Sequence, residues 1–136
     1  VFIIPFVLVC LTQNGLAAER LQQPSFSFEQ ARQGEHLYKS NCAICHENNM
    51  EGTFDTPALT GRFIRAWGGS SLSDLHHYIQ RAMPQMAPGI LSSKDVSALI
   101  AFILEKHGLP AGKKELPSSE QALQNKLMPK SIVTIK

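Results

Sequence analysis

The sequence has little of what marks several large protein classes. Its three cysteines in 136 residues are too few for a disulfide scaffold. Period-two alternation of apolar and polar residues is nearly absent, which argues against a β-rich fold, and there is no internal repeat. The apolar run at residues 1–11 is shorter than the roughly 20 residues that span a bilayer. With 43% hydrophobic and 18% charged residues, the chain has the composition of one soluble globular domain.

The apolar start of the chain resembles the hydrophobic region of a secretory signal peptide. It is followed by polar residues and by the small pair Ala17-Ala18, which fits a cleavage site before Glu19. We therefore predict a signal peptide at residues 1–18 and no membrane span after its removal. An uncleaved N-terminal anchor is the alternative.

Charge is unevenly distributed along the chain. Residues 19–60 hold three Lys/Arg and six Asp/Glu, a net charge of −3, whereas residues 61–136 hold ten and five, a net charge of +5. Such asymmetry can orient a molecule against a charged partner, although a scattered solvated surface explains it equally well. Nothing in the sequence indicates nucleic-acid binding.

Three segments have the caps and the apolar spacing of α-helices, so we predict an all-α fold. They span residues 27–42, 71–84 and 92–108. Each begins with a serine followed three residues later by Gln or Asp, which is the pattern of a capping box or close to it. Pro84 ends the second segment, and Gly108 closes the third.

Two stretches show no helical pattern. Residues 47–70 are rich in Gly, Pro, Thr and Asn, and an irregular loop of that length is unusual inside a compact domain. It becomes reasonable if the loop wraps a bound cofactor that completes the core. Residues 108–136 contain three prolines, and we expect an irregular segment lying over the surface. We place the domain at residues 19–116 and a tail at residues 117–136.

The segment Cys42-Ala43-Ile44-Cys45-His46 has the residues needed for covalent haem attachment. Two thiols about one helical turn apart can bond to the two vinyl groups of one porphyrin, and the adjacent imidazole can ligate the iron. We therefore predict one covalently bound haem c, held by Cys42 and Cys45, with His46 as an axial ligand. Because haem is attached in this way outside the cytoplasm, we expect the protein in the periplasm of a Gram-negative bacterium.

Two other uses of a Cys-x-x-Cys pair fit less well. A thioredoxin-type redox pair would follow a strand and open a helix in a βαβ unit, and no such pattern surrounds this one. A structural zinc site needs a second Cys/His pair, but His76 and His77 are adjacent and no further cysteine follows. We expect these two histidines on a solvated helix face rather than in a bis-His haem. His36 and His107 are also expected to be exposed.

A methionine is the expected second axial ligand, because electron-transfer haems are commonly held by His and Met. Met83 comes directly before Pro84, which ends the helix and fixes the chain direction where a sulfur must enter the pocket. Met86, three residues later, is the alternative. Met50 lies too close to the attachment site to reach the opposite haem face easily.

These motifs occur in the order found in the class I cytochromes c, which the chain resembles over roughly residues 28–108. The matching residues are Gly34, Tyr38, Cys42, Cys45, His46, Pro57, Ala58, Leu59, Met83 and Pro84. The resemblance implies a small fold in which the N- and C-terminal helices cross, with one middle helix and long loops wrapped around the haem. It places Gly34 at the close approach of the two helices, with Tyr38 and Phe102 filling the crossing.

The same resemblance implies roles around the haem. The Pro57 carbonyl would accept a hydrogen bond from the ligating imidazole, holding His46 in one tautomer and increasing its basicity, and Leu59 would pack against the ring. For Trp67, hydrogen bonding to a haem propionate and simple core packing both stay open. Arg62 and Arg65 are expected at the surface.

A narrower resemblance is to the cytochromes associated with periplasmic quinoprotein alcohol dehydrogenases. It rests on Met83-Pro84, Pro88-Gly89 and Gly108-Leu109-Pro110-Ala111-Gly112, with Met86 as a departure. It implies a single-electron carrier of a respiratory chain rather than an enzyme, with a dehydrogenase as donor and a terminal oxidase or another cytochrome as acceptor. The alternatives are a dedicated haem subunit of a dehydrogenase complex, or a haem protein with a labile sixth ligand for catalysis or gas sensing.

Overall fold

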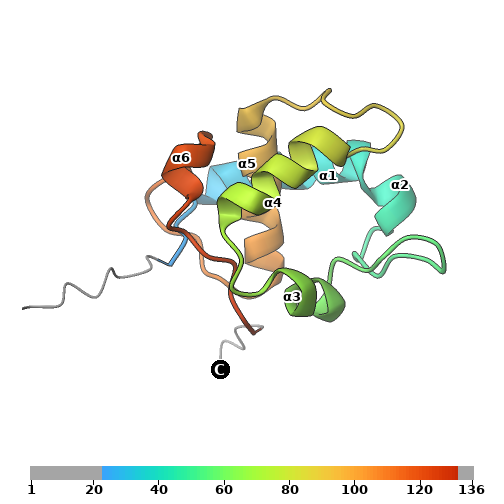
Figure 1. Cartoon of the computed structure of the whole chain (residues 1–136), viewed down its shortest axis with the longest axis horizontal. Coiled ribbons are helices and arrows are strands. Elements are labelled where there is room, and N and C mark those ends of the chain that lie inside the picture. Colours follow the sequence, from blue (N-terminus) through green and yellow to red (C-terminus); the bar gives the residue numbers. More distant parts are fainter. Residues whose placement is uncertain (1–22, 132–136) are drawn as a thin grey trace, which may run out of the picture.

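The computed structural model describes residues 23–131, and their regular structure is helical (Figure 1). The helices are α1 (Phe28–Asn41), α2 (Ala43–His46), α3 (Gly61–Trp67), α4 (Leu72–Ala82), α5 (Ser93–Lys106) and α6 (Glu120–Leu123). Within these residues there is no strand, only two isolated β-bridges. No helix in the described part is both long and apolar enough to cross a membrane. The all-α prediction is confirmed, whereas the predicted signal peptide lies outside the described residues.

The first and last long helices, α1 and α5, cross and form the centre of the domain (Figure 1). A Cβ atom at Gly34 would lie 1.9 Å from the carbonyl oxygen of Ala98 and 2.9 Å from Cβ of Phe102, so only glycine allows this approach. The rings of Tyr38 and Phe102 fill the crossing, with centroids 5.5 Å apart. Arg32 adds an ion pair between the helices, to Glu105. The crossing that the resemblance implies is therefore present.

The three long helices begin at the predicted serines, which are the N-caps of α1, α4 and α5. Only the last has a complete capping box: Ser92 accepts from the Asp95 amide, and the Asp95 side chain accepts from the Ser92 amide, both at 3.2 Å. Ser71 accepts from the Ser73 amide instead. Ser27 accepts from the Gln30 amide, but the Gln30 side chain is used for a tertiary contact.

The prediction that residues 47–70 are irregular is wrong for its second half, which contains α3. This helix is seven residues long and has no side-chain hydrogen bond at its N-cap, so it lacks the local signals that marked the other helices. It forms because Phe63 and Ile64 are buried and Trp67 packs against the core. Tertiary packing of one apolar face therefore stabilises α3.

The C-terminal segment, defined as residues 108–131, differs from the expected surface tail. It contains α6, and Leu116, Leu123 and Met128 in it are at most 2% exposed. Its backbone pairs with residues 69–72 through bonds such as Leu72 N–H to Lys126 O at 2.7 Å. Apolar residues scattered among prolines and glycines have no helical period, so their burial depends on contacts distant in sequence. Residues 132–136 lie outside the described part.

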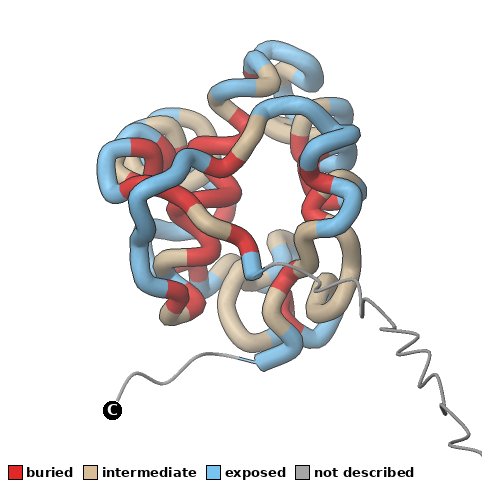
Figure 2. Tube along the Cα trace, turned by 90° about the vertical axis from the view of Figure 1, so that its left-hand side faces the viewer, coloured by how far each residue is buried: buried red, intermediate tan, exposed pale blue. Residues whose placement is uncertain are grey.

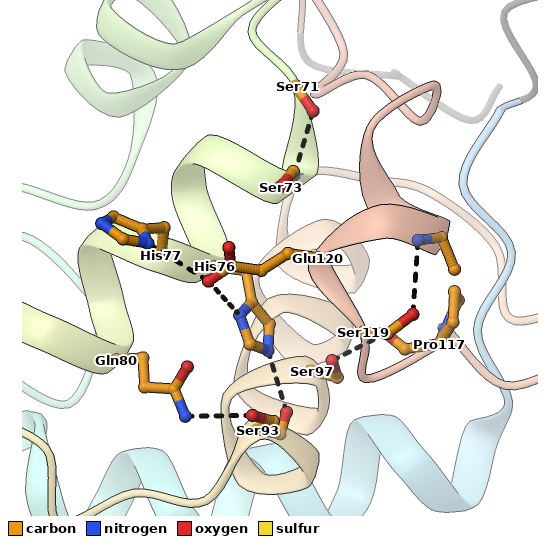
Figure 3. A network of polar contacts seen from close by, with 11 residues as sticks. Ser71, Ser73, His76, His77, Gln80, Ser93, Ser97, Pro117, Ser119 and Glu120 are labelled. Carbon is orange, nitrogen blue, oxygen red and sulfur yellow. Dashed lines mark hydrogen bonds and ion pairs between the residues drawn. The ribbon is translucent and has the colours of Figure 1, made fainter.

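A polar network joins α4 and α5 to this segment, including its helix α6 (Figure 3). His76 is fully buried and its Nε2 lies 3.0 Å from the Ser93 carbonyl, while His77 contacts Glu120 at 3.2 Å. Ser97 donates to the Pro117 carbonyl at 2.8 Å. The expectation of a solvated face holds for His77 and is wrong for His76, because α6 covers that side of α4.

Candidate haem site

The two thiols of the predicted attachment site lie at the junction of α1 and α2. Cys42 ends α1 and precedes α2, and Cys45 lies within α2, so about one helical turn separates them. Both are free, Cys42 half-buried and Cys45 exposed. Burial, with a smaller contribution from the neighbouring Cys45, raises the pKa of Cys42 to about 11, so this thiol is protonated at neutral pH.

The imidazole of His46 is buried and has one ring nitrogen engaged. Its Nδ1 lies 2.9 Å from the carbonyl oxygen of Pro57, and since a carbonyl only accepts, Nδ1 must donate. The hydrogen bond that the family resemblance implies is therefore present. It selects the tautomer whose Nε2 has a free lone pair, which is the form that ligates a metal.

The chain reverses sharply after His46, and this reversal brings Pro57 back to the imidazole. Glu47 and Met50 have positive φ angles of 63° and 62°. Gly52 donates its N–H to the His46 carbonyl at 3.1 Å. Tyr38 holds the start of the turn, because its hydroxyl donates to the Glu47 carbonyl at 2.6 Å.

Tyr38 thus has a second role that the sequence did not indicate. Burial raises the pKa of its hydroxyl to about 12, so the hydroxyl remains a donor at physiological pH. The helix crossing predicted an aromatic residue there; the phenolic oxygen was the available hint that it also makes a polar contact, since a buried Tyr O–H usually finds a partner.

The two candidate methionines differ strongly in exposure. Met83 is the C-cap of α4, half-buried and packed against the hydrophobic core. Met86 is 86% exposed. Met50 is 3% exposed and lies in the turn after His46. Of the two candidates, Met83 is therefore the one packed against the protein interior, at the end of a helix stopped by Pro84.

The remaining residues predicted around the haem lie at the edge of the core. Leu59 and Trp67 are both half-buried and packed against it. Trp67 lies between the rings of Phe63 and Tyr78, with centroid distances of 6.2 and 5.4 Å. Its contact with a propionate stays a prediction. Arg62 and Arg65 are exposed.

His107 is a residue that the sequence analysis placed wrongly. It was expected at the surface but is 3% exposed, and its Nε2 lies 3.0 Å from the Leu59 carbonyl. Burial lowers its pKa, so the imidazole is neutral at neutral pH. His36 is exposed as expected. The apolar stretch Ala98–Leu104, which ends three residues before His107 on the same helix, was the one signal of its burial.

The alternative uses of these residues find no support in the described structure. The Cys-x-x-Cys pair lies between helices, without the strand of a thioredoxin-type unit. Among residues 23–131 no three His, Cys, Asp or Glu side chains are arranged to hold a metal ion. His76 and His77 are engaged with Ser93 and Glu120 (Figure 3). The donor set of two free thiols, an oriented imidazole and a half-buried thioether fits haem c.

A family model described as cytochrome C oxidase, cbb3-type, subunit III matches residues 29–103, which is more than half of the chain. The chain belongs to this family of class I cytochromes c. It is therefore a haem-binding electron-transfer protein, and its function depends on redox partners.

One solved structure is similar to this cytochrome over most of its length. It is a chain of the crystal structure of the sulfane dehydrogenase SoxCD from Paracoccus pantotrophus, with a TM-score of 0.54 and 26% sequence identity. The match covers 82% of the cytochrome and 57% of that chain, so the cytochrome matches little more than half of that protein chain. No curated protein sequence matches it.

Proposed function

We propose that this cytochrome is a monohaem, single-electron carrier of the periplasm that performs no bond chemistry on a substrate. Its donor would be a dehydrogenase and its acceptor a terminal oxidase or another cytochrome. The observation that supports it best is the His46 imidazole, buried beside two free thiols and held by Pro57 in the ligating tautomer. The similarity to a dehydrogenase structure supports the donor class.

Each residue of the site would have a separate task. The thiols of Cys42 and Cys45 would each add S–H across one vinyl double bond, sulfur to one carbon and hydrogen to the other, which needs no oxidant. His46 and Met83 would hold the iron. When bound, haem supplies a one-electron Fe(II)/Fe(III) couple.

The protein's own contribution is to set the potential of that couple. The Pro57 carbonyl makes the His46 imidazole more basic, which favours Fe(III), whereas a thioether ligand and burial of the ring favour Fe(II). The exposed Cys45 and Ile44, which is 78% exposed, place this edge of the site at the surface. Electron exchange there would need only a small, transient contact.

Visible spectroscopy of the haem-loaded protein tests the ligand set. We expect Met83→Ala to abolish the sulfur-to-iron absorption band and Met86→Ala to leave it unchanged, because Met86 is exposed and Met83 is not. Loss of the band only in Met86→Ala would reassign the ligand. A wild-type ferric protein that is high-spin and binds external ligands would instead support catalysis or gas sensing.

A dedicated subunit of a dehydrogenase complex is the second candidate, and the similarity to a chain of SoxCD favours it. Affinity purification of the tagged cytochrome from its native host distinguishes the two. Recovery of a stoichiometric larger enzyme subunit that survives high salt would support the subunit. Recovery of the free cytochrome would support the mobile carrier.

A further inference from the structure

We propose that His107 is a positioning residue for His46. It would hold the segment 57–59 against the helical core and thereby maintain the hydrogen bond from the His46 imidazole to Pro57. The inference rests on the proposed function, in which His46 ligates the iron. It concerns a residue at the opposite end of the domain sequence, 61 positions after His46.

The position of the His107 ring is fixed by two contacts. Its Nε2 donates to the carbonyl oxygen of Leu59 at 3.0 Å, and its plane stacks on Phe63 at a centroid distance of 5.9 Å and an angle of 5°. The residue is the C-cap of α5 and is 3% exposed. Because the acceptor is a carbonyl, Nε2 must carry the proton. The ring is therefore a directed donor as well as a filler of space.

Leu59 is the point at which the segment 57–59 is anchored on both sides. Its N–H donates to the Met50 carbonyl at 2.9 Å, and its carbonyl accepts from His107. Pro57 has no N–H and cannot donate a backbone bond of its own. The bond to Met50 lies within the same loop, whose Met50 side chain is buried in the hydrophobic core. Of the two bonds at Leu59, only the one from His107 reaches the helical core.

These contacts connect the two partners of the His46–Pro57 hydrogen bond through the helical core. His46 is attached to α1 through α2, and α1 crosses α5 at Gly34, where no extra atom fits. From the end of α5, His107 reaches Leu59, two residues from the Pro57 carbonyl that accepts from His46. The same helix crossing thus positions both partners of the His46–Pro57 bond.

The surroundings of His107 explain why a smaller side chain would not keep the segment 57–59 connected to α5. A cavity of about 260 Å³ borders it, lined by Leu59, Thr60, Lys106 and residues 48–50. If the imidazole were removed, water from this cavity would hydrate the Leu59 carbonyl in its place. The segment would then lose its connection to α5 without leaving a buried unsatisfied group.

Two substitutions test separately the hydrogen-bond donor and the aromatic ring of His107. His107→Phe keeps an aromatic ring against Phe63 and removes the donor, whereas His107→Gln keeps an N–H donor and removes the ring. In the haem-loaded protein we would measure the exchange rate of the His46 Nδ1 proton by NMR, together with the reduction potential. For His107→Phe we expect exchange about tenfold faster, the effect of losing one hydrogen bond. We also expect a higher reduction potential, because the His46 imidazole becomes less basic and donates less electron density to the iron. For His107→Gln we expect both quantities close to wild type.

Ser97→Ala is the matched control for general destabilisation. Ser97 is also buried on α5 and donates to a distant carbonyl, that of Pro117, away from His46. We expect it to lower stability while leaving the exchange rate and the potential unchanged. The proposal is overturned if Ser97→Ala moves them as much as His107→Phe does. It is also overturned if His107→Phe leaves them unchanged, or if His107→Gln shifts them equally.

The wild-type protein separates failure of this inference from failure of the proposed function. A protected His46 Nδ1 proton and a low-spin spectrum in wild type mean that His46 ligates the iron, and the variants then test His107 alone. If wild type lacks both signals, the proposed ligand set is wrong, and the inference is rejected with it.

Discussion

At the scale of single residues, the tightest packing requirement in the domain is at Gly34. The carbonyl of Ala98 occupies the space that any side chain at this position would need. Because that atom belongs to the backbone of α5, it cannot rotate away as a side chain would. The two helices must therefore separate if Gly34 is replaced, and the Tyr38–Phe102 contact would separate with them.

We expect Gly34→Ala to lower the free energy of unfolding by about 3 kcal/mol, at the upper end for overpacking, because relief requires a shift of backbone. Chemical denaturation of the haem-loaded protein measures it. Gly61→Ala is the control, since its Cβ would meet only Arg65 Nη1 at 3.8 Å. That variant should lie within about 1 kcal/mol of wild type. Equal effects of the two substitutions would contradict the role given to the crossing.

At the scale of elements, the C-terminal segment is part of the domain and is joined to α1 by one side chain. The side-chain amide of Gln30 donates from its Nε2 to the Leu116 carbonyl at 2.9 Å, and its Oε1 accepts from the Leu116 N–H at 2.8 Å. Gln30 is 6% exposed and Leu116 2%, so neither backbone group has ready access to water. A polar side chain expected to cap α1 thus holds a segment 86 residues away.

We expect Gln30→Ala to cost about 2–3 kcal/mol of stability, because it leaves the N–H and the carbonyl of Leu116 buried without partners. Amide exchange in residues 108–131 should accelerate more than in α5. Denaturation and hydrogen exchange with mass spectrometry measure the two effects.

Gln33→Ala is the control for that substitution, since Gln33 is exposed on the same helix. It should change stability by no more than about 0.5 kcal/mol. If Gln30→Ala were as mild as this control, the segment would be held by its apolar residues alone.

At the scale of the whole molecule, the helices differ in how extensively they pack against one another. Close backbone packing joins α1 with α5 and α2, and α4 with α5 and α6, whereas α3 contacts its neighbours through side chains such as Trp67, which lies against Tyr78. In Figure 2 the described trace forms a ring with buried stretches on both sides. Within residues 47–60, between α2 and α3, only Met50 and Leu59 pack in or against the hydrophobic core, alongside hydrogen bonds such as His46 to Pro57. A haem bound by Cys42, Cys45 and His46 would add apolar contacts to this part.

We therefore expect haem removal to act unevenly. In the double variant Cys42→Ser/Cys45→Ser, residues 47–67 should lose amide protection, while α1 and α5 retain much of theirs through their own crossing. Hydrogen exchange of this variant against the haem-loaded protein measures it. Ile44→Ser, which alters an exposed position of the same motif, is the control and should behave like wild type. Uniform loss of protection across all helices would contradict the prediction.

Local sequence determined what depends on neighbours along the chain. The serine caps fixed the starts of α1, α4 and α5, Pro84 ended α4, and Cys42-Ala43-Ile44-Cys45-His46 placed two thiols and an imidazole within consecutive turns. These features follow from hydrogen bonding and spacing over three or four residues. The crossing at Gly34 was available as well, although only through resemblance to known cytochromes.

Only the tertiary structure decided which distant groups meet. It formed α3 without local signals and buried His76, His107 and the C-terminal segment, all of which the sequence had placed differently. The reason is physical: the partners of Gln30 and His107 lie 86 and 48 residues away, and no local pattern encodes such a bond. The sequence predicted the groups that would ligate a haem, and the fold brought the carbonyl of Pro57 to one of them, His46.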